Sequence, residues 1–283
     1  MRTEFFKPTD MKSALDLLEK YKDTAVIVNG GSDIAGKIAE GVVKPAAVIY
    51  IADIKELQYI TERDGKIAIG GAVTYAAMLS SPIIQKVPGL IEAVKHLASP
   101  PIRRIATAAG NLGTCAPSAD CATMLVGLGA KVVLASAGGE RTLAVEEFLV
   151  QSYKTALAPN ELIKEIYFDA PKAGDGSGYI RLARRKSQDI GNVLISASLT
   201  VKDGVCTKAA IGLGALGPAS MRATSVEEAI AGKKKEDALE YVRKNFPKEA
   251  KLRDDRFKQY KELVTCVAVE RAVAMAWNNA QGV

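Results

Sequence analysis

The sequence is poor in the residues that form most metal sites and nucleophilic catalytic sites. It contains one histidine and four cysteines in 283 residues. A zinc site of the HExxH type needs two histidines on one helix face, so this class of site is excluded. A catalytic triad would have to use His96, which lies in a helical pattern without an evident partner, and a position at a helix end is the simpler interpretation.

The four cysteines also lack the spacing of a metal site. Cys115, Cys121, Cys206 and Cys266 form no CxxC pair and no cluster of the kind that holds iron and sulfur. Cys115 and Cys121 lie close together in a glycine-rich stretch and could neighbour a ligand, but packing is the simpler role. We therefore predict no metal site and no catalytic side chain, so any catalysis depends on a bound cofactor or on backbone groups.

Long hydrophobic runs are missing as well. No apolar run is long enough to span a bilayer, and the segment Met1–Pro8 has no signal-peptide core. With so few cysteines, this predicts a cytoplasmic protein in a reducing compartment. Lysine and arginine number 38 against 32 aspartates and glutamates, a surplus that suits an anionic ligand or partner without naming one.

The order of predicted elements divides the chain into two α+β modules that join near residue 171. At about 150 residues per domain, the length also favours two domains. In the first module we expect helices over 11–21, 34–39, 75–80, 82–97 and 121–128, and strands over 25–28, 46–51, 57–60, 66–69, 131–135, 140–144 and 161–169. After the turn-rich loop 171–178 we expect strands over 179–183, 193–202 and 205–213, and then three helices, the last over about 254–278.

One motif suggests a nicotinamide-binding fold but does not fit its mechanism. Residues 212–217 read Gly-Leu-Gly-Ala-Leu-Gly, which matches GxGxxG. That motif must open a helix whose amino end faces a pyrophosphate, and Pro218 stands where this helix would already be under way. Glycines at a strand-to-loop transition are the better explanation.

Two other segments suit the binding of phosphate groups. Asn29-Gly30-Gly31-Ser32-Asp33 follows a predicted strand and enters a helix, so its amides can point at a ligand; an ordinary junction capped by Ser32 or Asp33 is the alternative. The segment 107–114 is similarly small and hydroxylated and leads to Asp120, although a tight crossing between packed elements explains it too. Together the two loops and the acid suit a ligand with a pyrophosphate and a ribose.

At these residues the chain resembles the flavin-binding subunits of molybdenum hydroxylases, which include bacterial xanthine dehydrogenases and aerobic carbon monoxide dehydrogenases. The family pattern is roughly Ala-Gly-Gly-Thr-Asp-Leu after the first strand, and Thr-Ile-Gly-Gly-Asn-Ile followed by Pro-x-x-Asp. This chain reads Asn29-Gly30-Gly31-Ser32-Asp33-Ile34 and Thr107-Ala108-Ala109-Gly110-Asn111-Leu112, with Thr114, Pro117 and Asp120 in step. Further matches at 102–104, 161–163, 181–185, 218, 222 and 253–257 extend the resemblance over essentially the whole chain.

The resemblance implies an α+β fold of two domains. Residues 1–170 would form a two-part FAD-binding domain of the vanillyl-alcohol-oxidase (PCMH) type, with sub-parts of about 1–55 and 56–170. Residues 171–283 would form a smaller α+β domain of the CO dehydrogenase flavoprotein C-terminal type. The cofactor would be FAD, bound without a covalent link.

The resemblance also implies which residues bind the FAD. They are Ile27, Val28, Asn29, Gly30, Gly31, Ser32, Asp33 and Ile34 around the pyrophosphate; Thr107, Ala109, Gly110, Asn111 and Thr114 beside the phosphates and flavin; Asp120 toward the ribose or adenine; and Ile163 and Arg181. Ala109 replaces a glycine of the family pattern, so its backbone must keep a negative φ or leave more room. Arg181 stands where lysine is commoner, and it keeps the charge but not the shape.

The function implied by the resemblance is electron transfer. A large partner subunit would carry the molybdenum cofactor and the substrate site, and a small one would carry [2Fe-2S] clusters. Electrons would reach FAD on this chain and pass to NAD or another acceptor. The alternatives are a stand-alone flavin-binding protein that acts in regulation or assembly, and a free-standing oxidase, for which no residues suited to substrate deprotonation stand out. We expect neither nucleic acid nor a membrane span among the partners.

Overall fold

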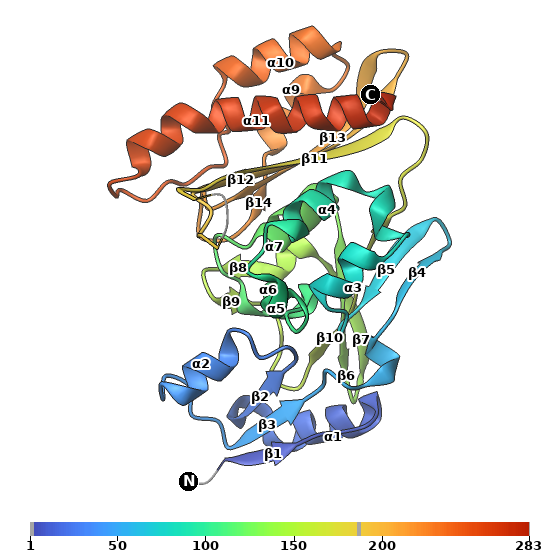
Figure 1. Ribbon diagram of the computed structural model, residues 1–283, viewed down its shortest axis with the longest axis vertical. Coiled ribbons are helices and arrows are strands. Elements are labelled where there is room, and N and C mark those ends of the chain that lie inside the picture. The colour runs from blue at the N-terminus through green and yellow to red at the C-terminus, as the bar shows by residue number, and fades with distance from the viewer. Residues whose placement is uncertain (1–2, 186–187, 283) are drawn as a thin grey trace.

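The computed structural model describes residues 3–185 and 188–282, so Met1 and Arg2 of the segment considered for a leader lie outside it. Figure 1 shows three successive layers along the long axis, each containing a β-sheet. The first is a three-stranded parallel sheet in the order β1 (Glu4–Phe6), β3 (Ala47–Tyr50), β2 (Ala25–Val28), with helices α1 (Met11–Tyr21) and α2 (Ile34–Ala39). Asp10 caps α1 by accepting a hydrogen bond from the Ser13 amide at 2.8 Å.

The second layer is a five-stranded antiparallel sheet in the order β4-β5-β10-β6-β7. Its strands are β4 (Ile60–Arg63), β5 (Lys66–Gly70), β6 (Lys131–Ser136), β7 (Gly139–Ala144) and β10 (Leu162–Asp169). Helices α3 (Tyr75–Ser80), α4 (Pro88–Lys95), α5 (Pro100–Arg103), α6 (Ala108–Thr114), α7 (Asp120–Gly127) and α8 (Val145–Phe148) and the small hairpin β8 (Leu149–Gln151) and β9 (Lys154–Thr155) complete it.

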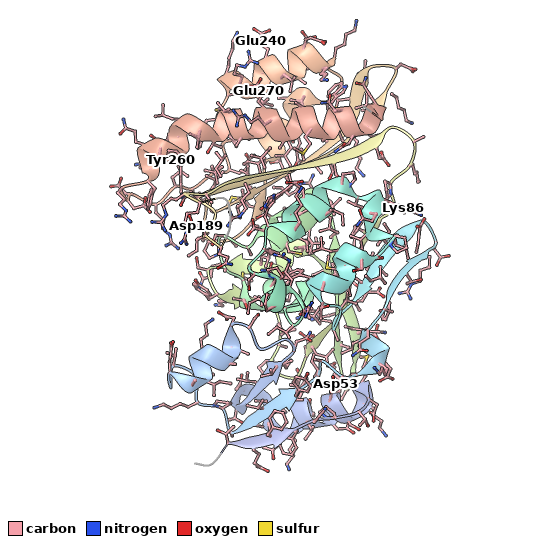
Figure 2. All side chains as sticks on the ribbon, viewed as in Figure 1. Asp53, Lys86, Asp189, Glu240, Tyr260 and Glu270 are labelled. Atoms are coloured by element: carbon pink, nitrogen blue, oxygen red, sulfur yellow. The ribbon has the colours of Figure 1, made fainter. Side chains whose placement is uncertain are left out.

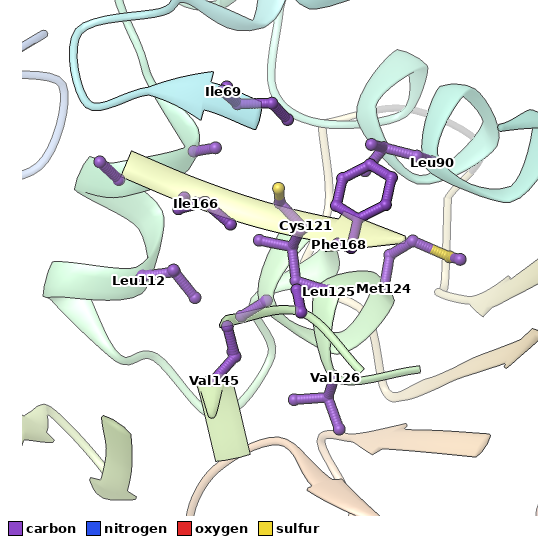
Figure 3. Close-up of a cluster of buried hydrophobic side chains, with 14 of the residues drawn as sticks. Ile69, Leu90, Leu112, Cys121, Met124, Leu125, Val126, Val145, Ile166 and Phe168 are labelled. Atoms are coloured by element: carbon purple, nitrogen blue, oxygen red, sulfur yellow. The ribbon is translucent and has the colours of Figure 1, made fainter. Parts of the chain in front are cut away.

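Helix α7 forms the centre of the main hydrophobic core. All of its residues are buried. Figure 3 shows Cys121, Met124 and Leu125 of this helix among Ile166 and Phe168 of β10 and Ile69 of β5. A helix that is buried all round has no solvent-facing side, so it packs both on its own sheet and on the next layer.

The third layer is a four-stranded antiparallel sheet in the order β11 (Asp175–Leu182), β12 (Val193–Lys202), β13 (Val205–Gly214), β14 (Met221–Arg222). Helix α11 (Lys258–Gln281) lies across one face, with α9 (Thr224–Ile230) and α10 (Lys235–Lys244) beside it (Figure 1). Helices α4 and α7 of the preceding layer contact the other face. The sheet is therefore covered on both sides.

The GxGxxG segment has a packing role at this junction. A Cβ on Gly212 would lie 2.4 Å from the Thr123 carbonyl oxygen, and a Cβ on Gly214 would lie 2.0 Å from the Thr123 hydroxyl. In turn, a Cβ on Gly127 would lie 2.2 Å from Ser196 Oγ of β12. These glycines let β12 and β13 approach the backbone of α7, which confirms that the motif is not a nucleotide-binding turn.

Most predicted elements are confirmed, with several corrections. The predicted loop at 107–114 is wrong: these residues form helix α6, capped by Thr107. Strand β11 begins at Asp175, so the second half of the predicted loop 171–178 is strand, and a Cβ on Gly176 would lie 2.1 Å from the Ala276 carbonyl oxygen of α11. The strand predicted over 57–60 lies at 60–63 instead, where it forms a hairpin with β5 through Asp64 and Gly65. Residues 82–97 give a 3-10 turn and then α4, which Pro88 opens.

Short elements without a clear pattern were not predicted: β1, β8, β9, β14, α5 and α8. His96 lies at the end of α4, as expected, and its Nε2 is 2.9 Å from Glu92 Oε1. Cys115 and Cys121 are both buried, in agreement with a packing role. Within the described ranges, no helix combines the length and apolar character needed to cross a membrane.

Candidate cofactor site

The first loop leaves a row of backbone amides free. Strand β2 ends at Val28 and helix α2 begins at Ile34. No described residue accepts a hydrogen bond from the backbone amides of residues 30–34. Asp33 is the N-cap residue but makes no side-chain cap bond, and its Oδ2 instead lies 2.6 Å from Lys37 Nζ. The alternative of a side-chain-capped turn is therefore not what forms here, and the free amides give the loop the character of an anion-binding site.

Asn29 provides a second sign of a ligand. Its side chain is buried, and its Nδ2 donates to the Gly71 carbonyl at 2.6 Å. Its Oδ1 is also buried but accepts no hydrogen bond from any described residue. A buried acceptor without a donor is unfavourable by about 1–3 kcal/mol, so a hydroxyl or amide donor from a bound molecule would complete this position.

Ile163 lies close to Asn29 because both residues contact Gly71. A Cβ on Gly71 would lie 2.2 Å from the Ile163 carbonyl oxygen, and the Gly71 amide donates to the Lys164 carbonyl at 2.8 Å. Since Gly71 also accepts from Asn29, residues 29, 71 and 163 form a contiguous group. The structure thus brings Ile163 next to the first loop, although the two segments are far apart in sequence.

Position 30 has room only for glycine because another backbone segment of the chain lies against it. A Cβ at this position would lie 1.8 Å from the Ile105 carbonyl oxygen and 2.9 Å from the Ala106 nitrogen. The structure therefore shows a close backbone approach at this glycine, against the segment that precedes α6, and the predicted approach to a phosphate stays a prediction. Gly31 has a φ of +68°, a left-handed conformation that favours glycine. The two glycines serve different geometric needs.

Helix α6 presents its amino end close to this contact. Thr107 Oγ1 accepts from the Gly110 amide at 2.9 Å, while the Ala109 amide donates to no described residue. Ala109 is helical and buried, so it keeps a negative φ and its methyl group packs in the core. Gly110 is exposed, and a Cβ there would meet only the Thr107 hydroxyl, at 3.0 Å. The surface over Gly110 is thus open for a ligand.

The remaining predicted residues of α6 and of the first loop differ in their surroundings. Asn111 Oδ1 accepts from the Ala122 amide at 3.1 Å, which ties α6 to the start of α7. Thr114 is half-buried at the end of α6, before Cys115 turns the chain with a φ of 50°. Ile27 and Val28 are half-buried in β2, and Ser32 is exposed in the first loop.

Asp120 and Arg181 form a buried ion pair with each other. Asp120 Oδ1 lies 3.0 Å from Arg181 Nε and accepts from the Tyr179 hydroxyl at 2.8 Å. Only 9% of the Arg181 side chain and 6% of the Asp120 side chain are exposed. Burial raises the pKa of the Asp120 carboxyl, and the Arg181 guanidinium opposes that rise. Because α7 and β11 belong to different layers, this pair also holds the C-terminal sheet to the central one.

A cavity of about 570 Å³ opens beside the first loop. It lies between the first and second layers and is lined by Asn29, Gly30, Tyr50, Ala52, Asp53, Gln58, Tyr59, Ile60, Ala72, Val73, Thr74, Ala77, Arg104 and Ile105. Figure 2 labels Asp53 at this junction, and its carboxylate pairs with Lys7 at 2.6 Å. The volume is within the range of sites for small molecules and cofactors.

Several residues at this cavity were not predicted. Tyr59 donates to the buried Glu165, which also pairs with Arg63 at 2.7 Å, and burial raises the pKa of the Tyr59 hydroxyl. Thr74 caps α3 and pairs with Thr107 through an isolated β-bridge, so two helix caps lie together. Arg104 lies in the segment 102–104, which matches the family, whereas Tyr59 and Thr74 lie in no recognised motif. Their sequence neighbours show no pattern that points to a ligand.

The site suits a phosphate-bearing cofactor. It offers free amides on a loop and on a helix start, a buried acceptor without a donor, and an adjoining cavity. Among the residues that the structure describes, no group of three or more histidine, cysteine, aspartate or glutamate side chains is arranged to hold a metal ion. FAD fits the residues present.

Comparison with known proteins agrees with this geometry. The family described as the FAD binding domain in molybdopterin dehydrogenase matches residues 1–171, and the CO dehydrogenase flavoprotein C-terminal domain matches residues 178–276. The nicotinate dehydrogenase FAD-subunit of Eubacterium barkeri is 34% identical over 81% of this chain and 79% of its own length. The carbon monoxide dehydrogenase medium chain of Afipia carboxidovorans is 29% identical over 74% and 73%.

Solved structures give the same result. The carbon monoxide dehydrogenase of Hydrogenophaga pseudoflava that lacks the Mo-pyranopterin moiety of its cofactor is similar over 99% of this chain and 98% of the matched chain, with a TM-score of 0.90 and 27% identity. Quinoline 2-oxidoreductase from Pseudomonas putida, at 23% identity and a TM-score of 0.87 over 100% and 98%, shares the fold. These findings confirm the resemblance and the two-domain architecture. The chain belongs to the family of FAD-binding subunits of molybdopterin dehydrogenases, as an FAD-dependent oxidoreductase subunit.

Proposed function

We propose that this chain is the electron-transfer subunit of a molybdenum-containing hydroxylase or dehydrogenase. It takes electrons from [2Fe-2S] clusters of a small partner subunit and passes them to NAD or another acceptor. A large partner subunit carries the molybdenum cofactor and the substrate site. The observation that carries the proposal is the row of free amides at residues 30–34 beside the unpartnered Asn29 Oδ1, in a chain of this family.

The residues proposed to hold FAD come from five segments. They are Ile27, Val28, Asn29, Gly30, Gly31, Ser32, Asp33 and Ile34; Thr107, Ala109, Gly110, Asn111 and Thr114; Asp120; and Ile163 with Arg181. When bound, FAD supplies the ability to accept electrons singly and to release them as a pair. The proposed domains are 1–170, with sub-parts of about 1–55 and 56–170, and 171–283.

Within this site the residues of the chain bind and orient the cofactor. The amides of residues 30–34 bind the pyrophosphate, and the unpartnered Asn29 Oδ1 accepts a hydroxyl hydrogen bond from the cofactor. Thr107 fixes the start of α6, so that the open face over Gly110 lies against the cofactor. Asn111, Asp120 and Arg181, besides their proposed contacts with FAD, join α6, α7 and β11 to one another and so support the shape of the site.

The names of two relatives support the proposal of partner subunits. The names nicotine 6-hydroxylase medium subunit and carbon monoxide dehydrogenase medium chain describe parts of larger assemblies, and the chain covers 80% and 73% of these two relatives. The four cysteines of this chain do not cluster in the sequence, which agrees with iron–sulfur centres on another subunit. We propose a cytoplasmic assembly.

Isolation of the native assembly tests this proposal. The chain, tagged at its C-terminus in its own host, is purified under mild conditions and analysed for subunits, flavin, molybdenum and iron. We expect a larger and a smaller partner, with molybdenum and iron in those partners and FAD on this chain. Adjacent genes should encode both partners. Isolation of the FAD-bound chain alone, with no partner genes nearby, would contradict the proposal and support the stand-alone flavoprotein.

A further inference from the structure

A second cavity lies at the junction between the central and C-terminal layers. Its volume is about 450 Å³, and it shares no lining residue with the cavity beside the first loop. Its walls come from the start of α4, the end of α7 and the connecting segment 169–173, and its floor is one end of the β11-β12-β13 sheet. Lys86, labelled in Figure 2, marks the α4 side. Both domains therefore contribute to this cavity.

The charge around this cavity is positive. Lys172, Lys202 and Lys208 line it, are exposed, and form no ion pair with any described residue. Lys86 also lines it, but its Nζ pairs with Glu62 at 2.6 Å. Asp175 faces the cavity too, and its two carboxylate oxygens accept from the Thr200 hydroxyl at 2.6 Å and from the Lys172 amide at 2.8 Å. Asp169 also lines the cavity and forms no ion pair with any described residue, so four lysines stand against two carboxylates in the lining. The lining is therefore positive overall, which favours an external anion.

The floor of the cavity adds a polar group without a partner. In the antiparallel register Ser198 pairs with Ala210 and Thr200 pairs with Lys208, so these side chains share one face of the sheet. Ser198 Oγ is buried and makes no hydrogen bond with any described residue. A hydroxyl can donate to an anionic oxygen, so Ser198 together with Lys202 and Lys208 offers a mixed donor set.

The opposite wall is apolar. Val87, Pro88 and Leu128 line it, and they face the polar floor across the cavity. A simple inorganic ion would use only the floor. A molecule with an organic part would contact both the polar floor and the apolar wall. The volume of the cavity is within the range that small-molecule sites occupy.

We propose that this cavity binds a small phosphorylated organic molecule. Its phosphate lies against Lys202, Lys208 and Ser198, and its organic part lies against Val87, Pro88 and Leu128. Phosphate is favoured because lysine binds it as a point charge, and several ammonium groups match its multiple negative charge. The inference goes beyond FAD binding and uses different residues. Because the ligand contacts both domains, its binding also stabilises their junction.

Calorimetric titration of the FAD-saturated full chain tests this inference. The probes are adenosine monophosphate and inorganic phosphate, and saturation with FAD keeps either probe from entering the flavin site. We expect adenosine monophosphate to bind, and more tightly than inorganic phosphate because it also covers the apolar wall. The Lys202→Glu/Lys208→Glu variant should bind at least tenfold more weakly, and Ser198→Ala should weaken binding by a smaller factor.

The matched control is Lys12→Glu/Lys131→Glu, which makes the same change of net charge at exposed positions of α1 and β6. It should bind like the unmodified chain. If the charge-reversal variant fails to fold, Lys202→Gln/Lys208→Gln serves in its place. No binding to the unmodified chain, or equal binding by the cavity and control variants, would overturn the inference. Flavin absorbance of each sample is read separately, so failure to bind FAD and failure of this cavity are distinguishable.

Discussion

Gly30 lacks room for any side chain, and the cause is a segment that lies far from it in sequence. A glycine beside a predicted strand suggests phosphate contact, and that contact stays a prediction. The structure adds a second reason for the glycine, because the Ile105 carbonyl oxygen lies against its Cα. A contact between distant backbones has no local pattern, so it could not be predicted from the loop itself.

Gly30→Ala tests this contact. The added methyl group would lie 1.8 Å from the Ile105 oxygen, so the loop must shift. We expect a loss of about 2 kcal/mol in the free energy of unfolding, by analogy with overpacked sites, together with loss of bound FAD. The control is Gly36→Ala in α2, where a Cβ meets nothing within 4 Å. It should be neutral or slightly stabilising in chemical denaturation and should keep its flavin.

Gly110→Val tests the open face of α6. A side chain at Gly110 is sterically tolerated by the protein apart from the Thr107 hydroxyl, so the fold should survive. We expect flavin content to fall at least tenfold, because the branched side chain occupies the surface proposed for FAD. Gly113→Val, in the same helix with nothing within 4 Å, is the matched control. Equal flavin content in both variants would show that the cofactor does not lie over Gly110.

Among single elements, hydrophobic periodicity predicted the bounds of those helices and strands that bury one apolar face. Helix α1 and strands β2 and β12 have the predicted bounds, since each has a clear apolar face and a strong cap or turn. Helix α6 was missed because four of its seven residues, Gly110, Asn111, Gly113 and Thr114, carry little helix propensity. Its helical form comes from the Thr107 cap and from packing of Leu112 in the core.

The start of β11 was missed for a related reason. Gly176 and Gly178 predict a turn, but they stand in a strand because the backbone of α11 lies directly against them. Gly212 lies in the predicted strand 205–213, but the reason for a glycine there becomes visible only in the structure, where the Thr123 carbonyl of α7 lies against it. Glycine in these strands allows close packing between layers. From a single sequence, such a glycine cannot be distinguished from one that forms a turn.

Gly212→Val tests the packing of β13 on α7. The side chain would meet the Thr123 carbonyl oxygen at 2.4 Å and Ser196 Oγ at 2.4 Å. We expect the free energy of unfolding to fall by about 2 kcal/mol or more, and the melting temperature to fall with it. Gly138→Val is the control, because a Cβ there meets only the end of the Ser136 side chain, at 3.8 Å. Similar melting curves for both variants would contradict the packing role of the motif.

At the scale of the whole molecule, the Asp120–Arg181 pair joins the two domains. The sequence predicted both residues as cofactor contacts, and the cofactor role remains a prediction. Their mutual ion pair could not be predicted, because it depends on how β11 lies over α7. A buried pair of this kind is strongly destabilised when one member is removed, since the other charge is left without a partner.

Arg181→Met tests this junction. We expect a loss of about 3 kcal/mol in the free energy of unfolding near neutral pH. The pKa of Asp120 is already raised, and without Arg181 it rises further. A folded state with a raised carboxyl pKa binds the proton more readily than the unfolded chain, so the deficit should shrink as pH falls from about 8 to about 5.

Denaturant unfolding at both pH values measures that deficit. Arg184→Met is the control, because 65% of the Arg184 side chain is exposed and its ion pair with Asp189 should contribute about 1 kcal/mol or less. A deficit for Arg181→Met that grows as the pH falls would contradict the assignment of Asp120 as its buried partner.

The proposed function depends on FAD binding by the first loop and the start of α6. The most direct measurement is titration of the purified, flavin-free chain with FAD, followed by its quenched fluorescence, with the Gly30→Ala variant in parallel. We expect saturation at one FAD per chain, reversible bleaching of the bound flavin by a reductant, and at least tenfold weaker binding by the variant. A chain that takes up no FAD, or a variant that binds it as tightly as the unmodified chain, would show that FAD is not held at this site.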